Sequence, residues 1–466
     1  MLEKLLNLQP GEWRRLLPFF FVYSILFGGF TLADGLSLTL FVNSVGSTHL
    51  PTAYTIIAVA NLIGVSFYFF QANRLGSVAT CYLIFGTTGL LFLGSWTIIR
   101  FTNLDVIAYG ILFVTREISL NMILLHFGTY LQDYFDREEI KRVLPIVYAG
   151  GRLGGIVGAS VLENASAALG LINLILLVFA TCLVAVILVA RISRKMSPRV
   201  TTPSSSSQQV LPSDSEVQAA RYLSGFVYYV WQNQLLLWIT VTSIVFIVCR
   251  WILYYQYNTF FQNYFSENEF NSLVEELMSE LSGEPIDDDS PRQSMAQFLG
   301  RYTQIALGIS LGLQLLVVSR LIRWLGTATV HSLYALTFLI ALALNLGTLT
   351  LSLAVVCRFV ETELRFGIRN PVMQLVTNEF TKDIRTRVRA WTLGILIPVA
   401  TLIASGLLAF LAKAELLTWL SWIGVVFGLG YLTTSLLMGR SLRNQKPTDT
   451  PKQSRRQVLL RNRLPD

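Results

Sequence analysis

Long apolar runs separated by short polar breaks fill most of this chain, and their lengths predict helices that cross a membrane. About 20 apolar residues are needed to span a bilayer as an α-helix, and the runs approach or exceed that length. Continuous runs of this kind indicate helices rather than barrel strands. We expect an all-α, polytopic membrane protein with twelve spans, at residues 17–42, 53–71, 78–99, 106–131, 144–163, 170–190, 232–262, 296–318, 328–345, 348–376, 391–412 and 416–439.

The twelve expected spans divide into two sets of six. Residues 191–222 lie between the sets and include Pro203 followed by a run of serine and glutamine, which is typical of a flexible linker. The loops that follow spans four and ten share residue types at a constant spacing. Two pseudo-symmetric six-helix bundles joined in this way predict the major facilitator fold. The expected parts are a bundle at 1–190, a cytoplasmic linker at 191–222, a bundle at 223–440 with an acidic external loop at 263–295, and a basic cytoplasmic tail at 441–466.

The distribution of basic residues predicts the orientation in the membrane. The chain has a formal net charge of +8 and only 14% charged residues, with a mean hydropathy of +0.55. If the N-terminus is cytoplasmic, 26 of the 36 lysines and arginines fall on the cytoplasmic side and three on the opposite side. This asymmetry predicts that both termini are cytoplasmic in a plasma or inner membrane. It also accounts for the basic charge through anionic lipid, without nucleic acid as a partner.

Charged residues inside the apolar runs concentrate in the first and fourth span of each set. Span one holds Asp34, span four holds Arg116 and Glu117, and span seven holds Arg250. Span ten holds the largest group: Arg358, Glu361, Glu363, Arg365 and Arg369. An ionised side chain facing lipid is costly, so such groups normally face a protein interior or a watery cavity. Four equivalent helices carrying charge therefore predict one polar cavity between two halves that rock by alternating access.

The charges of span ten follow a helical spacing. Arg358, Glu361 and Arg365 lie at i, i+3 and i+7, which places them on one helical face, and Arg369 continues the series. Glu361 and Arg365 are four residues apart and can neutralise each other. We expect this face to line the solute path; the alternative is that it only joins span ten to its neighbours.

Further polar residues extend the candidate site. Arg116 and Glu117 are adjacent and point about 100° apart, so we expect one to face the cavity and the other to pair elsewhere. Asn121 lies one turn beyond Glu117. Asp34 and Arg250 occupy equivalent helices and are expected to bridge the halves.

Two more residues are candidates by type. Arg152 lies among glycines that favour close helix packing, and its planar guanidinium suits a carboxylate or phosphate. His126 could serve proton coupling, although a hydrogen-bonded packing role is the simpler interpretation. We expect seven arginines and four acidic residues within the membrane. This excess of positive charge attracts anions.

The sequence lacks signatures of an enzyme or a metalloprotein. No nucleophile elbow, phosphate-binding loop, zinc spacing or paired-carboxylate pattern occurs in a supporting context, so we expect no catalytic residue, metal or cofactor. The four cysteines fall within spans and are expected to pack there as small apolar residues. The expected partners are a small anionic solute and the lipid bilayer, and the expected state is a monomer.

Several segments resemble the nucleotide (ATP/ADP) translocase family. Residues 32–39 (LADGLSLT) resemble its first-span motif, Glu117 falls at its span-four glutamate, and residues 139–145 (EIKRVLP) resemble its Glu-x-Lys-Lys-x-x-Pro. Residues 387–390 (RVRA) and Pro398 resemble a later pair of motifs. The resemblance implies an antiporter that moves a nucleotide or a phosphorylated metabolite.

The chain departs from that family at two positions where lysine is expected. Ala33 replaces the first-span lysine, and Thr401 aligns with the lysine that follows the later proline. The sequence therefore leaves open another organic anion. It also leaves open three other classes: a non-transporting sensor or scaffold that retains the carrier fold, a lipid flippase with an apolar lateral opening, and a membrane-embedded enzyme.

Overall fold

The computed structural model describes residues 12–72, 74–135, 137–196, 226–280, 290–377, 379–380, 384, 388 and 391–444. The helices of the N-terminal half are α2 (Glu12–Ser44), the short η1 (Ser47–His49), α3 (Leu50–Ala72), α4 (Ser77–Phe101), α5 (Asp105–Gln132), α6 (Arg137–Leu169) and α7 (Leu171–Lys195). Those of the C-terminal half are α9 (Gln234–Glu280), α10 (Ser290–Leu313), η2 (Gln314–Val318), α11 (Ser319–Leu325), α12 (Thr327–Ala343), η3 (Leu344–Leu346), α13 (Leu351–Phe359), η4 (Val360–Arg369), α14 (Asn370–Thr377), η5 (Thr392–Leu396), α16 (Ile397–Lys413), η6 (Leu417–Trp419) and α17 (Leu420–Asn444).

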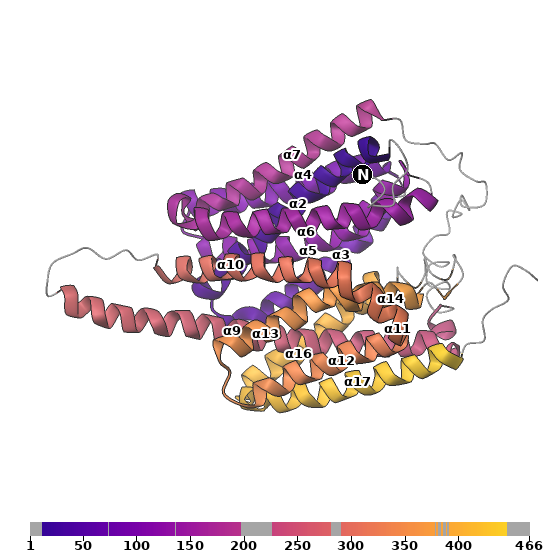
Figure 1. The fold of residues 1–466 in the computed structure, drawn as a ribbon. Helices are drawn as coiled ribbons and strands as arrows, with labels where there is room; N and C mark the ends of the chain where they lie inside the picture. Colours follow the sequence, from indigo (N-terminus) through magenta and orange to yellow (C-terminus); the bar gives the residue numbers. More distant parts are fainter. Residues whose placement is uncertain are drawn as a thin grey trace, which may run out of the picture.

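The two halves form two bundles that lie side by side, α2 to α7 in one and α9 to α17 in the other (Figure 1). Within the described residues, eleven helices are long and apolar enough to cross a membrane. The expected tenth span is also present, because α13, η4 and α14 follow one another without a break. This tenth span is not one of the eleven apolar helices because it holds several charged residues. The predicted all-α, polytopic membrane fold is confirmed.

The ends of some helices differ from the expected boundaries. Helix α7 runs to Lys195 and α17 to Asn444, each beyond the bundle limits expected from the sequence. Most of the expected linker and tail lies outside the described residues. Helix α9 continues to Glu280, into the segment expected as an external loop at 263–295, and extends beyond the bundle (Figure 1).

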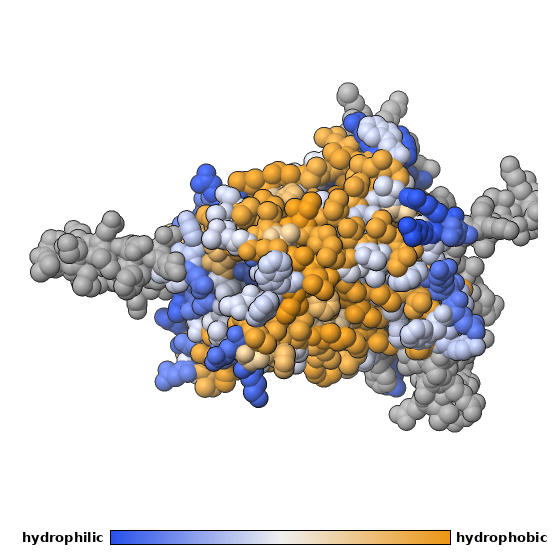
Figure 2. All heavy atoms as spheres, turned by 90° about the horizontal axis from the view of Figure 1, so that it is seen from below, coloured by the Kyte–Doolittle hydropathy of each residue, from blue (hydrophilic) through white to orange (hydrophobic). Residues whose placement is uncertain are grey.

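The face of the molecule seen in Figure 2 is apolar across its middle and polar at both ends. Around the molecule, apolar side chains such as Ile63, Leu90, Val157 and Val426 are also exposed. Such an extent of exposed apolar surface is unusual for a soluble monomer and is what a bilayer requires. The chain is an integral membrane protein. We call the end at which α2 begins and α17 ends the termini side, and the opposite end the loop side.

The two halves are packed unequally at the two sides. On the loop side they share one core, in which α2 and α3 contact α9; the rings of Tyr54 and Trp251 lie 4.2 Å apart there. Ser47 also donates its backbone N–H to Gln262 across the halves, at 2.9 Å. On the termini side, the described residues form two separate cores, one around Phe19 in the N-terminal half and one around Leu236 in the C-terminal half.

Helices α2 and α6 pack through glycine. A Cβ added at Gly154 would lie 1.9 Å from the backbone oxygen of Ser24, and one added at Gly158 would lie 2.0 Å from that of Gly28. Backbones approach this closely only where a helix lacks side chains, as in other membrane helix pairs. The glycine-rich run therefore packs α6 against α2, which sets the position of Asp34 on α2 relative to Arg152 on α6.

Replacing Gly154 with Ala should force these two helices apart. The added methyl group meets backbone rather than a flexible side chain, so we expect a loss of about 2 kcal/mol or more in unfolding free energy. Gly86→Ala is the matched control, because a Cβ at Gly86 meets nothing within 4 Å. Denaturant titration of purified protein in detergent micelles measures both. Equal stability of the two variants would contradict the packing described here.

Candidate functional site: an inter-half charge cluster

Seven charged side chains from four helices form one connected set of ion pairs at the interface between the halves. We call this set the charge cluster. Its members come from α2, α5, α9 and the α13–η4 segment, which correspond to spans one, four, seven and ten: Asp34, Arg116, Glu117, Arg250, Arg358, Glu361 and Arg365. The sequence placed charge in these four spans, and the structure brings that charge together.

Asp34 on α2 holds two arginines at one end of the cluster. Its Oδ1 lies 2.8 Å from Nη2 of Arg116 in the same half, and its Oδ2 lies 3.1 Å from Nη2 of Arg358 in the other half. The expected direct bridge between Asp34 and Arg250 is wrong. The structure pairs each of them with other partners, and ion pairs through Arg116 and Glu117 link the two.

Glu361 holds two arginines at the other end. Its Oε1 lies 2.6 Å from Nε of Arg250 and 3.5 Å from Nη2 of Arg365, the pair expected from their four-residue spacing. Tyr257 donates its hydroxyl to Oε2 of Glu361 at 3.0 Å. Both oxygens of this carboxylate are therefore used.

Arg116 and Glu117 connect the two ends. Nη1 of Arg116 lies 2.9 Å from Oε1 of Glu117, which is also 3.7 Å from Nη2 of Arg250. Both neighbours belong to the charge cluster, and Glu117 also pairs with a neighbouring helix through Arg250 of α9. Their Cα–Cβ bonds diverge, but the arginine stem is long enough to turn its guanidinium toward the adjacent carboxylate.

Most of the charge cluster is buried, and this decides its energetics. The side chain of Glu361 is 0% exposed and that of Arg358 is 4% exposed, whereas that of Asp34 is 33% exposed. Buried ions lose much of their hydration energy, and only close, multiply bonded pairing offsets that loss. Removing one partner would leave an uncompensated charge, so the cluster behaves as a unit.

The part of span ten that carries Glu361 and Arg365 is a π-helix, η4. Single π-turns within α-helices are frequently found at functional sites, and they change which residues share a face. Glu361 faces Arg250 of α9, whereas Glu363, two residues later, pairs with Arg152 of α6. Span ten therefore contacts both halves through opposite sides.

A second set of contacts joins α6 to the C-terminal half. Arg152 and Glu363 form an ion pair, and Gln304 of α10 donates to Glu163. Among the described residues, Arg152 pairs with Glu363 and forms no ion pair with the seven members of the charge cluster. Glu363 was not among the residues expected at the site, because its spacing from Glu361 places it near the opposite face of a helix.

Three other polar residues lie elsewhere. Asn121 donates to Oδ1 of Asn61 on α3 at 3.3 Å and joins no ion pair. His126 contacts the hydroxyl of Tyr68 at 3.2 Å and the carbonyl of Ser77 at 2.8 Å, which satisfies both ring nitrogens of a neutral imidazole. This supports the packing interpretation of His126. The guanidinium of Arg369 lies 3.7 Å from the ring centre of Phe246 and takes part in none of the cluster's ion pairs.

Aromatic rings surround the arginines of the charge cluster, and sequence reasoning did not select them. Arg358 lies between the rings of Tyr257 and Tyr302, at 5.9 and 5.5 Å from their centres. Arg250 lies 4.6 Å from the ring centre of Trp251. Aromatic residues are common throughout this chain, so no spacing singles these out; only their contacts do.

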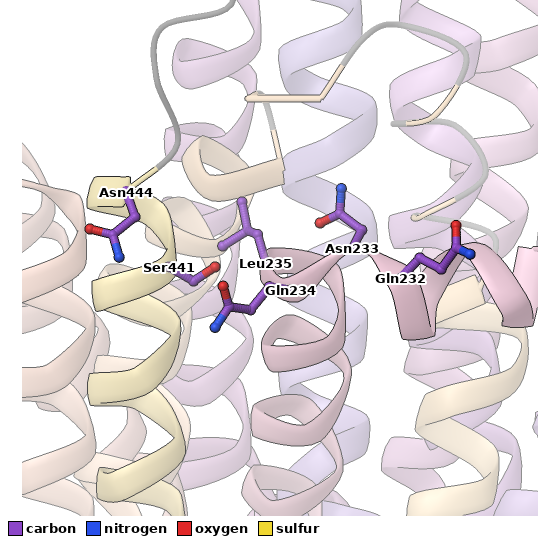
Figure 3. A pocket seen from close by; sticks show the side chains of 6 residues that line it. All are labelled: Gln232, Asn233, Gln234, Leu235, Ser441 and Asn444. Atoms are coloured by element: carbon purple, nitrogen blue, oxygen red, sulfur yellow. The ribbon is translucent and has the colours of Figure 1, made fainter.

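The hollow in Figure 3 is separate from the charge cluster. It lies at the termini side, between the start of α9 and the end of α17, and is lined by Gln232, Asn233, Gln234, Leu235, Ser441 and Asn444. No group of three or more metal-ligating side chains occurs among the residues that the structure describes. All four cysteines are buried and free.

Comparison with known proteins identifies the fold. No protein-family model matches the sequence, and no curated protein matches it significantly. Solved structures match over nearly the whole chain. They include the peptide transporter PepTSo of the POT family, with a TM-score of 0.63 at 9% identity over 93% of this chain and 99% of that one.

Two further structures agree. The nucleoside transporter NupG matches with a TM-score of 0.60 at 13% identity, over 93% of this chain and all of its own. The xylose transporter XylE from E. coli matches with a TM-score of 0.58 at 11% identity, over 94% of this chain and 97% of its own. The TM-scores and the coverage, at low sequence identity, establish a shared fold: the major facilitator fold with two pseudo-symmetric bundles.

Proposed function

We propose that this protein is a membrane transporter that moves a small anionic organic solute by alternating access. The carrying observation is the charge cluster: Arg116, Arg250, Arg358 and Arg365 face Asp34, Glu117 and Glu361 between the two halves, an excess of one positive charge. A site with excess fixed positive charge attracts anions. The nucleoside, peptide and sugar transporters of the same fold support transport of a small molecule.

The unequal packing of the two sides supports alternating access. A shared core on the loop side and separate cores on the termini side are expected for one of the two end states of a rocking carrier. Ion pairs such as Arg358–Asp34 and Arg250–Glu117 cross between the halves. These pairs keep the arginines neutralised while no solute is bound. An incoming anion can take the place of the carboxylate in a pair.

Carboxylates and phosphates are both anions that arginine binds through its planar fork. The resemblance to nucleotide translocases directs attention to nucleotides and phosphorylated metabolites, and to exchange rather than one-way transport. We assign Arg152 and the seven members of the charge cluster to the solute path, both termini to the cytoplasm, and a monomer as the working unit. A non-transporting sensor or scaffold is the second candidate, since ion pairs bridge the space between the halves in this conformation.

Uptake into liposomes by the purified protein tests this proposal. A panel of radiolabelled carboxylates and phosphates should include at least one that enters saturably, while neutral amides and sugars of similar size should not. Protein-free liposomes are the control. Saturable uptake of neutral solutes alone would overturn the anionic assignment, and no uptake of any solute from either side would favour the sensor or scaffold.

A further inference from the structure

The position of Asp34 indicates which chemical group the solute site accepts. Its two carboxylate oxygens are divided between two guanidiniums, Oδ1 to Arg116 and Oδ2 to Arg358. These arginines belong to opposite halves. A carboxylate in this position therefore contacts both halves at once. A solute bound between the halves of a carrier makes the same kind of contact.

Asp34 is also the carboxylate of the charge cluster that a solute can reach. Its side chain is 33% exposed, whereas those of Glu117 and Glu361 are 6% and 0% exposed. An incoming anion thus meets Asp34 first. The other two carboxylates are shielded by the arginines that they neutralise.

The arginines around Asp34 retain donors for a second anion. Nε and Nη1 of Arg358 are buried and have no hydrogen-bond acceptor among the described residues, and the same holds for Nε of Arg116. A buried donor without an acceptor costs about 1–3 kcal/mol, and more when it is charged. These donors are therefore available to the acceptor atoms of an incoming anion. Oε1 of Glu117 is also buried without a hydrogen bond, although it lies within two ion pairs.

The surroundings of the unsatisfied donors are flat and aromatic. The rings of Tyr257 and Tyr302 flank the Arg358 guanidinium, and Phe113 lies 5.7 Å from that of Arg116. Flat aromatic rings beside unsatisfied donors suit an organic acid, whose apolar body packs on rings while its carboxylate binds the donors.

We infer that the solute is an organic carboxylate, and that its carboxylate displaces that of Asp34 from Arg116 and Arg358. Asp34 is then an internal competitor that occupies the carboxylate position between transport events. This inference rests on the proposed function and narrows it from anions in general to carboxylates. A phosphate is the other anion that arginines would accept, and the experiment below distinguishes the two.

Asp34→Asn removes the competing charge and keeps the shape of the side chain. Benzoate is the probe, titrated against purified protein in detergent while tryptophan fluorescence and thermal unfolding are recorded. We expect benzoate to bind at least 10-fold more tightly to Asp34→Asn than to the unmodified protein. Benzamide, the neutral analogue, should bind neither. Adding Arg358→Gln to Asp34→Asn should abolish the gain.

Glu363→Gln is the matched control. It also removes one carboxylate from an inter-half ion pair, with Arg152, but outside the position between Arg116 and Arg358. It should leave benzoate binding unchanged. An equal gain in Glu363→Gln would show a general effect of excess positive charge and would overturn the inference.

Two other outcomes also decide against it. Equal benzoate affinity in Asp34→Asn and the unmodified protein would show that Asp34 does not compete. Tighter binding of inorganic phosphate than of benzoate by Asp34→Asn would assign the position to phosphates, and anion transport would still stand. If Asp34→Asn unfolds on extraction, Asp34→Ala extracted in acetate replaces it. We expect this variant to remain folded in acetate and to unfold in acetamide. Unfolding in acetate would equally refute the carboxylate position.

Discussion

Glu361→Gln should lower the free energy of unfolding by about 3–5 kcal/mol, the largest effect on stability that we expect from any isosteric change in this protein. The Glu361 carboxylate is fully buried and neutralises Arg250 and Arg365 while accepting from Tyr257. An amide of the same shape can still accept a hydrogen bond, but it cannot neutralise a charge. Two guanidiniums would then share a buried site with Glu117 alone. Denaturant titration in mixed detergent micelles measures the loss.

The control for this prediction is Glu415→Gln. Glu415 lies exposed in the short connection that follows α16, so the same chemical change removes no buried charge there. We expect that variant to differ from the unmodified protein by no more than about 0.5 kcal/mol. If Glu361→Gln were as stable as Glu415→Gln, the buried ion pairs of the charge cluster would not be contributing as described.

Much of the fold follows from the sequence because lipid imposes simple rules. Each apolar run had to be a helix of a certain length, and each of the twelve expected spans corresponds to helical structure. The concentration of charge in four spans followed from the same rule, since ions avoid lipid. The sequence therefore identified which helices meet at the centre before any contact between them was known.

The pairing of those charges could not be derived in the same way. Adjacent residues such as Arg116 and Glu117 meet because a flexible arginine stem bends, which helical periodicity does not describe. Arg152 finds Glu363 because η4 and α6 approach each other, and the π-helical geometry of η4 is not encoded in an apolar pattern. Helical periodicity predicts on which face of its helix a charged residue lies. Its ion-pair partner depends on how that face is placed against a second helix.

Asn121 shows a further limit of helical spacing. Its position one turn beyond Glu117 made it a candidate for the cavity, yet its amide bonds to Asn61 on the neighbouring α3. The hydrogen-bonding groups of a polar residue inside a membrane helix are satisfied as well by a polar neighbour as by water in a cavity. Spacing alone does not distinguish the two, and a partner on another helix decides the outcome.

Arg358→Ala should nearly abolish transport. Arg358 carries the inter-half bond to Asp34 and holds two buried donors, Nε and Nη1, for an incoming anion. Two charge-assisted hydrogen bonds contribute about 3 kcal/mol together, which corresponds to a loss of about 100-fold in affinity for the anion. Arg358→Lys should recover little of this, because an ammonium group lacks the planar fork.

The measurement that tests the account most directly compares initial rates of anion uptake into liposomes by the unmodified protein, Arg358→Ala and Arg301→Ala. Arg301 lies exposed on α10, so its removal provides a matched loss of one arginine outside the charge cluster. We predict saturable uptake by the unmodified protein and by Arg301→Ala, and a fall of about 100-fold for Arg358→Ala at subsaturating solute. Uptake by Arg358→Ala at the unmodified rate would contradict the assignment of the charge cluster as the solute site.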